Sequence, residues 1–374
     1  MFGLMSFYRK EIDIMKNRIL FLIFNIFLIY FVPQASQGCT TFVLDHNDQH
    51  VVGKNFDWMV DDGLIIINKR GVSKKAISVK EAHARPATWT SKYGSLTFNQ
   101  HGREMPHGGM NEAGLVVHAM MLPGTVYPPP DSRPAISRLQ WIQYQLDNFS
   151  TVKEIIASDS TLRISSSAGS GPHFLCIDKQ GDAVSIEFID GKLVYHSKDT
   201  MPFKALTNST YETSAALFKT HERMGNAFPM PIGNASGSRF VRTVSMIKQY
   251  KSKPSKPMVD YAFDILSNVA GPHTKWRMVF DIENSRVYFK SFSNPRMRYF
   301  DFSSFDLSCA SAVKILDVNA EIEGDVTNEF QDYTQQINGD LIRNAFKKTP
   351  SLRGVPEATL KYLTIYPEYT RCRQ

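Results

Sequence analysis

Cys39 is the residue whose type and position most clearly predict chemistry. It follows a segment with the layout of a removable export signal and precedes the apolar run Thr40–Leu44. If cleavage falls between Gly38 and Cys39, the mature chain begins with a thiol and a free α-amine on the same residue. A free thiol has a pKa of about 8.5 and a free α-amine one of about 7.7–8.0, so the amine can accept the thiol proton near neutral pH. Position 39 therefore predicts a nucleophile that carries its own base.

Residues 1–38 resemble a secretory signal peptide. Lys16 and Arg18 form a basic start, residues 19–32 an apolar run, and residues 35–38 a small-residue segment before the cut. That run of about 14 residues is shorter than the roughly 20 needed to cross a bilayer, so we expect cleavage and no stable membrane span afterwards. Met15 is an alternative true start. The mature protein is then expected in the periplasm or outside the cell.

An alternative interpretation of Cys39 is a lipoprotein site, in which the cysteine is acylated and its amine is blocked. Such sites prefer small aliphatic residues before the cysteine, and Ser36 and Gln37 fit that preference poorly. Under this hypothesis the chain would be a lipid-anchored binding protein without catalytic activity.

Composition and cysteine content narrow the class of protein. An apolar fraction of 43% and an aromatic fraction of 12% are typical of a packed globular chain. The net charge is +7, but the basic residues are scattered in runs no longer than two, so nucleic-acid binding is not expected. Cys176 lies in an apolar run and is expected to be a buried free thiol, whereas Cys309 and Cys372 are candidates for a bridge that sequence alone cannot assign. No CxxC or HExxH pattern is present, so we expect neither a metal site nor a cofactor.

Five short motifs occur in a fixed order along the mature chain. They are Cys-Thr-Thr-Phe at 39–42, Gly-Lys-Asn-Phe-Asp-Trp at 53–58, Gly-Met-Asn-Glu-Ala-Gly-Leu at 109–115, Leu-Thr-Asn-Ser at 206–209 and Ser-Arg-Phe-Val-Arg at 238–242. In this order and spacing they resemble the choloylglycine hydrolase and penicillin V acylase family of N-terminal nucleophile hydrolases. The resemblance runs from residue 39 to about 305. Residues 89–95 and 276–277 are more similar to the Gram-negative acylase branch than to the gut bile-salt hydrolases.

The resemblance implies a role for each polar residue of the motifs. Cys39 would be the nucleophile and its α-amine the base, with Asp57 holding that amine in position. Asn208 would donate its side-chain amide to the oxyanion, and Asn111 would contribute a second donor.

Three further residues complete the implied site. Arg239 would supply positive charge near the thiolate. Lys54 departs from the family pattern, which usually has arginine there; lysine keeps the charge but loses the planar fork of donors. Trp58 would line the pocket for the acyl group. We therefore expect Lys54 to affect activity or substrate choice.

The elements that must position these residues are strand-rich in the first half of the mature chain. Apolar runs predict strands over 40–44, 51–58, 64–69 and 114–121, and a meander over 173–197. Periodicity predicts helices over 136–158, 238–250 and 258–269. Within the first of these stretches, a second, shorter helix is expected to begin at Thr151 with Ser150 as its N-cap. A late hairpin is predicted over 277–292. This order indicates an α+β fold with antiparallel sheets, and the resemblance implies the four-layer αββα arrangement.

We therefore expect a single hydrolase domain over 39–374, with a polar tail from about 317. The implied reaction is hydrolysis of a linear amide with an apolar acyl group through a thioester. Penicillin V and acyl homoserine lactones are the preferred substrate hypotheses, and conjugated bile acids are the alternative. The proline-rich loop 124–132 is expected near the pocket mouth. Relatives are often tetramers, so the resemblance also implies a homotetramer.

Overall fold

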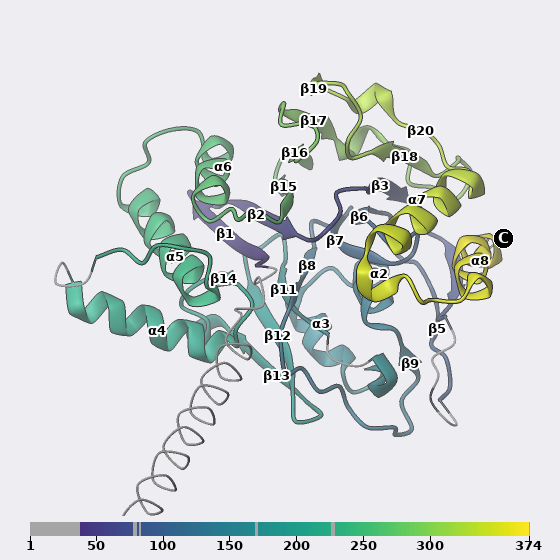
Figure 1. Ribbon diagram of the computed structural model, residues 1–374, viewed down its shortest axis with the longest axis horizontal. Coiled ribbons are helices and arrows are strands. Elements are labelled where there is room, and N and C mark those ends of the chain that lie inside the picture. Colours follow the sequence, from purple (N-terminus) through teal and green to yellow (C-terminus); the bar gives the residue numbers. More distant parts are fainter. Residues whose placement is uncertain (1–37, 78–80, 82–83, 169–170, 226–228, 374) are drawn as a thin grey trace, which may run out of the picture. The chain divides into compact units, whose positions relative to one another are not determined.

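Two large, mostly antiparallel sheets form the centre of the molecule (Figure 1). The computed structural model describes residues 38–77, 81, 84–168, 171–225 and 229–373. The strands of the first sheet are β1 (Thr40–His46), β2 (Gln49–Asp57), β14 (Ala205–Leu206), β15 (Thr274–Asp281), β16 (Arg286–Ser291), β17 (Arg298–Asp301) and β19 (Gly324–Asp325). Their order across the sheet is β14-β1-β2-β15-β16-β17-β19.

The second sheet has nine strands in the described residues. They are β3 (Leu64–Asn68), β6 (Ser95–Asn99), β7 (Pro106–Asn111), β8 (Val116–Met121), β11 (Pro172–Ile177), β12 (Ala183–Ile189), β13 (Lys192–Ser197), β18 (Lys314–Asp317) and β20 (Gln331–Asp332). Their order is β13-β12-β11-β8-β7-β6-β3-β18-β20. Two small sheets pair β9 (Ala135–Ile136) with β10 (Arg163–Ile164), and β4 (Val72–Lys75) with β5 (Thr88–Thr90) and β21 (Arg371–Cys372).

Helices cover the outer faces of both large sheets. The helices of the described residues are α2 (Arg138–Asn148), α3 (Val152–Ser158), α4 (Tyr211–Met224), α5 (Ser236–Ser252), α6 (Met258–Asn268), α7 (Gln335–Lys348) and α8 (Glu357–Ile365). α5 and α6 pack on the first sheet, whereas α2 and α3 pack on the second. The result is an α+β fold with the expected four layers.

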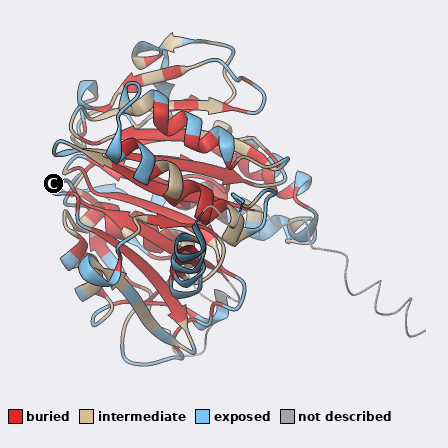
Figure 2. Ribbon diagram, turned by 90° about the vertical axis from the view of Figure 1, so that its left-hand side faces the viewer, coloured by how far each residue is buried: buried red, intermediate tan, exposed pale blue. Residues whose placement is uncertain are grey.

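The burial of the central strands on both faces explains why their sequences are continuous apolar runs. Both sheets are covered on both faces, so every residue of β3 and β6 is buried and their sequences do not alternate. In Figure 2 the central strands are buried along their length, while exposed residues gather on the outer faces of the helices. The largest apolar cluster joins residues of both sheets with α5 and α6.

Several sequence predictions are confirmed and others need correction. The predicted strands, the meander and the helices at α5 and α6 are present with ends shifted by a few residues. The cap of α3 is Thr151 rather than Ser150, because the Thr151 side chain accepts from the backbone of Glu154 in a capping box. The segment from 317 is not simply a polar tail, since it contains α7, α8 and several buried side chains.

The expected export signal and the alternative start at Met15 lie outside the described residues. No helix within the described ranges is both long and apolar enough to cross a membrane. From Gly38 onward the described residues form one compact unit.

Candidate active site

Cys39 lies at the start of β1, beside the end of β2. The register pairs Thr40 with Asn55, which brings Cys39 next to Asp57. The Asp57 backbone N–H donates to Cys39 Sγ at 3.4 Å, and the thiol donates to the Asp57 carbonyl at 3.8 Å. Cys39 is 5% exposed. The hairpin of β1 and β2 therefore holds the thiol at one end of the sheet.

The Asp57 carboxyl is almost fully buried beside the thiol. Burial raises its pKa, against the opposing effects of a Thr274 hydrogen bond and the charges of Arg239 and Lys54. One of its oxygens, Oδ1, has no hydrogen-bond partner among the described residues. A buried carboxylate oxygen without a donor is costly, so this atom suits a nearby cation or N–H group.

Lys54 is fully buried and reaches from β2 toward the second sheet. Its Nζ donates to the Ala119 carbonyl at 2.6 Å. Burial lowers the pKa of its ammonium, while Cys39 and Asp57 act in the opposite direction. Lys54 therefore lies close enough to the thiol and the carboxyl to influence both charges.

Arg239 connects the backbone of the nucleophile to the neighbouring loop. It sits in the first turn of α5, and its Nη1 donates to the Cys39 carbonyl at 2.5 Å and to Thr40 Oγ1 at 2.7 Å. Its Nη2 donates to Asn208 Oδ1 at 2.7 Å. A β-carbon added at Gly38 would lie 2.7 Å from this guanidinium. A larger residue before the nucleophile would therefore require the Arg239 guanidinium to shift.

Asn208 follows β14, the strand that pairs with β1 on the side opposite β2. Its Oδ1 accepts from Arg239, and its Nδ2 donates to the Met121 carbonyl at 2.8 Å. Its backbone N–H donates to Ser236 Oγ at 2.9 Å. Because the oxygen is held by a cation, the amide nitrogen is fixed as the end that faces β8. Nδ2 carries a second hydrogen that none of the described residues takes.

Asn111 is not part of this site. Its Nδ2 donates to the carbonyls of Leu146 and Phe149 at 2.9 and 2.7 Å, and its Oδ1 accepts from the backbone of Ala113 and Leu115. Both amide hydrogens are therefore used to fasten the turn between β7 and β8 to the end of α2. Because both hydrogens of its amide are already bonded to backbone carbonyls, we do not retain Asn111 as an oxyanion donor.

A cavity of about 260 Å³ opens beside the thiol. It is lined mostly by apolar and aromatic residues: Cys39, Phe56, Asp57, Trp58, His101, Met105, His107, Ala119, Met120, Met121, Arg138, Leu139, Pro172, Phe346, Ser351 and Leu352. Trp58 is among them, as the sequence predicted. None of the residues 124–132 is among the residues that line it, and a position of the proline-rich loop near its mouth stays a prediction.

Two histidines in the lining of the cavity, the buried His101 and the half-buried His107, were not predicted from the sequence. His107 Nε2 and His101 Nδ1 share a hydrogen bond of 3.0 Å. Burial, with a smaller contribution from Arg138, lowers the pKa of His101 to about 4. Burial likewise lowers the pKa of His107. Both imidazoles are therefore neutral at neutral pH and add no positive charge to the cavity. In the described residues no cluster of three or more His, Cys, Asp or Glu side chains has the arrangement of a metal site.

Comparison with known proteins adds a family to this geometry. Residues 39–315 match the family described as linear amide C-N hydrolases, choloylglycine hydrolase family. A penicillin V acylase from Pectobacterium atrosepticum is 28% identical over 320 residues, covering 73% of this chain and 83% of that protein.

Two solved structures resemble the fold. The penicillin V acylase from Agrobacterium tumefaciens matches with a TM-score of 0.68 and 29% identity, covering 79% of this chain and 98% of that one. A variant of the conjugated bile acid hydrolase from Clostridium perfringens matches with a TM-score of 0.62 and 21% identity, covering 75% and 97%.

Proposed function

Because the chain belongs to the choloylglycine hydrolase family of linear amide C-N hydrolases, and is therefore an amidohydrolase, we propose that Cys39 is its nucleophile. The observation that supports this most directly is the position of the thiol. Cys39 lies at the edge of an apolar cavity, Asp57, Lys54 and Arg239 interact with it, and Arg239 in turn holds Asn208.

The proposed reaction has two steps. In the first, the Cys39 α-amine accepts the thiol proton, the sulfur attacks the acyl carbon, and the carbonyl oxygen becomes an oxyanion. The C–N bond then breaks, the departing nitrogen takes the proton from the α-ammonium, and a thioester remains. In the second step water adds to the thioester, releases the carboxylic acid and returns the thiol.

The site supports each charge that forms in this reaction. Asn208 Nδ2, oriented by Arg239, is the amide donor for the oxyanion. The Oδ1 of Asp57 has no partner among the described residues, and in this proposal it accepts from the α-amine that cleavage would create at Cys39. Lys54 supplies the positive charge that favours the thiolate.

We further propose that cleavage after Gly38 releases this amine and that the enzyme works in the periplasm or outside the cell. The glycine before the nucleophile packs against the Arg239 guanidinium, and the segment before it has the composition of an export signal. The intact mass of protein recovered from the exported fraction tests this proposal. A mass that begins at Cys39 supports it, whereas added diacylglycerol mass contradicts an α-amine base.

The substrate proposal rests on the size of the cavity. Its volume of about 260 Å³ lies below the roughly 300–1,000 Å³ typical of small-molecule sites. An aryloxyacetyl group, as in penicillin V, or a medium-length acyl chain, as in acyl homoserine lactones, suits this space. A steroid acyl group needs more room, so conjugated bile acids are the alternative. A panel in which bile-acid conjugates are turned over far faster than the others would reverse this order.

The central test is replacement of the nucleophile. In Cys39→Ala we expect release of amine from the best substrate of the panel to fall at least about 1,000-fold, with a thermal midpoint close to that of the wild type. The small change in side-chain volume leaves the hairpin of β1 and β2 in place. Amine release and thermal unfolding are measured on the same preparations.

Cys176→Ala is the matched control. Cys176 is also a buried free cysteine, but it lies on β11 and does not line the cavity. We expect this variant to lose some stability and to keep its turnover. Retained turnover in Cys39→Ala would refute the proposed nucleophile.

A further inference from the structure

The chain continues well beyond the part that matches its family. The match ends at residue 315, and residues 316–374 then form the second half of β18, together with β19, β20, α7, α8 and β21. We call residues 316–374 the C-terminal extension. In Figure 1 its last helices lie on the side of the molecule away from α4 and α5, and Tyr366, just after α8, contacts Gln140 of α2.

The C-terminal extension supplies part of the cavity beside Cys39. Phe346 at the end of α7, and Ser351 and Leu352 in the turn that follows, line it together with residues of the family core. Phe346 is 9% exposed and packs in one apolar cluster with Met105 and Ile342. The cavity is therefore closed on one side by residues that the family match does not include.

A row of rings leads from Phe56, on the strand beside the nucleophile, to Phe346. Phe56, the neighbour of Asp57, packs against His107 with ring centroids 4.9 Å apart. His107 packs against His101 at 5.0 Å, and His101 meets the edge of Phe346 at 5.6 Å. Phe346 and Cys39 also belong to different apolar clusters. An acyl chain that starts at the thiol would therefore meet Phe346 at its far end.

Buried hydrogen bonds hold α7 in this position. Asn338 is fully buried; its Oδ1 accepts from the Arg103 backbone at 2.8 Å, and its Nδ2 donates to the Thr364 carbonyl at 3.2 Å. Lys348 forms an ion pair with Asp62 at 2.8 Å. These contacts join α7 to α8 and to the loops near the cavity. The side of the cavity that the C-terminal extension closes is therefore fixed in position.

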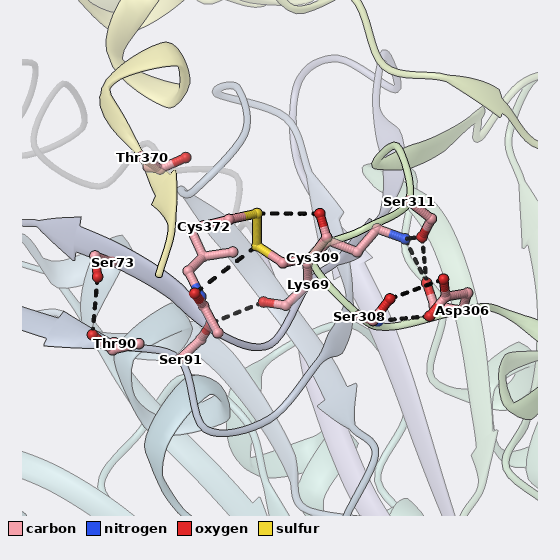
Figure 3. The surroundings of a disulfide bond; sticks show 12 residues. Lys69, Ser73, Thr90, Ser91, Asp306, Ser308, Cys309, Ser311, Thr370 and Cys372 are labelled. Atoms are coloured by element: carbon pink, nitrogen blue, oxygen red, sulfur yellow. Dashed lines mark hydrogen bonds between the residues drawn. A yellow bond between two sulfur atoms is a disulfide. The ribbon is translucent and has the colours of Figure 1, made fainter. Parts of the chain in front are cut away.

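The end of the chain is also fastened. Tyr366 donates to the Lys75 carbonyl at 2.7 Å and accepts from Gln140 Nε2 at 2.8 Å. A disulfide joins Cys309 to Cys372, where β21 pairs with β4 (Figure 3). The sequence left this pairing open, and the structure assigns it. Both ends of the C-terminal extension are thus tied to the family core.

We propose that the C-terminal extension forms the far wall of the acyl site and limits the length of the acyl group, with Phe346 and Leu352 as the specificity-determining residues. This inference rests on the proposed function. The chemical class of substrate is an amide whose acyl group is uncharged, apolar and no longer than the distance from Cys39 to Phe346 permits. The side chains that the C-terminal extension brings to this wall, Phe346 and Leu352, are apolar, which agrees with an uncharged acyl group.

The test compares Phe346→Ala with Phe346→Trp on straight-chain N-acyl amides from butanoyl to dodecanoyl. Truncation removes the barrier at the far end, so the ratio of kcat/KM for dodecanoyl to hexanoyl amides should rise roughly tenfold or more in Phe346→Ala. The larger indole should shorten the acceptable chain, so the same ratio should fall in Phe346→Trp. Leu352→Ala should also raise the ratio of kcat/KM for dodecanoyl to hexanoyl amides.

Leu360→Ala is the matched control. Leu360 lies on α8 and packs against the same apolar cluster as Phe346, but it does not line the cavity. Its truncation should lower the thermal midpoint and leave the acyl-length ratio unchanged. A shift of the ratio in Leu360→Ala as large as that in Phe346→Ala would show a general loosening and overturn the proposal.

Binding of the product acids separates this inference from the proposed function. Butanoic to dodecanoic acids are titrated calorimetrically into the Cys39→Ala protein with and without Phe346→Ala. If the wild type turns over no amide, the proposed function fails, and the acid-binding profile still tests the wall. The proposed limit on acyl length is refuted if folded Phe346→Ala and Phe346→Trp leave the acyl-length profiles of turnover and of acid binding unchanged. This outcome does not depend on whether Cys39 is the nucleophile.

Discussion

Lys54 is the residue whose burial says most about the chemistry around Cys39. A fully buried ammonium is costly unless it is paired, and this one has the Ala119 carbonyl, Cys39 and Asp57 around it. Replacement of Lys54 by Met would remove the cation and leave less positive charge to offset the burial of the Asp57 carboxyl. The buried ammonium of Lys54 therefore indicates a role beside its neighbours in the site rather than a contribution to the stability of β2.

We expect Lys54→Met to lower kcat/KM by at least about 100-fold, because the thiolate and the oxyanion both lose a nearby positive charge. Burial lowers the pKa of Lys54 below 10.5, so the wild-type ammonium is lost earlier than that of an exposed lysine as pH rises. Activity should fall on that alkaline side. Lys54→Arg keeps its charge to a much higher pH, so its alkaline fall should move upward in a kcat/KM profile.

Lys69→Met is the control for loss of a buried lysine. Burial also lowers the pKa of Lys69, but its ammonium donates to the Asp306 carbonyl and Ser311, outside the cavity. We expect reduced stability with an unchanged pH profile. Wild-type rates in Lys54→Met would mean that the charge has no catalytic role.

At the scale of the elements, the turn between β7 and β8 depends on Asn111. Four hydrogen bonds join its amide to backbone groups of that turn and of the end of α2. The side chain is 1% exposed, so its removal would leave these groups unpaired in the interior. Each buried unpaired group costs about 1–3 kcal/mol.

We therefore expect Asn111→Ala and Asn208→Ala to fail in different ways. Asn111→Ala should lower the free energy of unfolding by at least about 3 kcal/mol and leave kcat of the folded fraction within a few-fold of wild type. Asn208→Ala should lower kcat by about 100- to 1,000-fold. Denaturant unfolding and single-turnover rates measured on the same samples separate the two effects. A kcat loss in Asn111→Ala as large as that in Asn208→Ala would return Asn111 to the oxyanion site.

The elements nearest Cys39 could be predicted because their apolar runs are continuous and bounded by turns. The strand expected over 51–58 is β2, and the helices expected over 238–250 and 258–269 are α5 and α6. The pairing of β2 with β15, which sets Thr274 opposite Asp57, could not be predicted. Pairing between strands far apart in the chain depends on packing that no local pattern contains.

The site itself could be predicted only in part. Lys54, Asp57, Asn208 and Arg239 were selected by their motifs and do surround Cys39, although their roles remain predictions. The position of Asn111 could not be foreseen, because an asparagine in a Gly-rich turn has the same sequence whether its amide faces a substrate or a helix. The wall was missed because α7 is polar overall, and its apolar stripe is visible only when helical spacing is applied to Ile337, Leu341, Ile342, Ala345 and Phe346.

At the scale of the whole molecule, the disulfide closes the C-terminal extension onto the family core. Cys309 and Cys372 are 63 positions apart, and a cross-link over a loop of that size reduces the entropy of the unfolded chain by the equivalent of about 4 kcal/mol. The bond lies beside β4 and β21, whereas Phe346 is held by α7 and by the contacts of Asn338. Stability and acyl selectivity should therefore depend on different contacts of the same segment.

The double variant Cys309→Ser with Cys372→Ser tests this separation. Its free energy of unfolding should fall by up to about 4 kcal/mol, so that its thermal midpoint drops by several degrees, and reductant should lower the wild-type midpoint in the same way without affecting the variant. Well below the midpoint, its acyl-length ratio should equal that of the wild type, because Asn338 and Tyr366 still hold the wall in place. Phe346→Ala should show the reverse pattern, with a changed ratio and an intact response to reductant. A relaxed acyl-length ratio in the folded double variant would mean that the disulfide, rather than the buried hydrogen bonds, positions the wall.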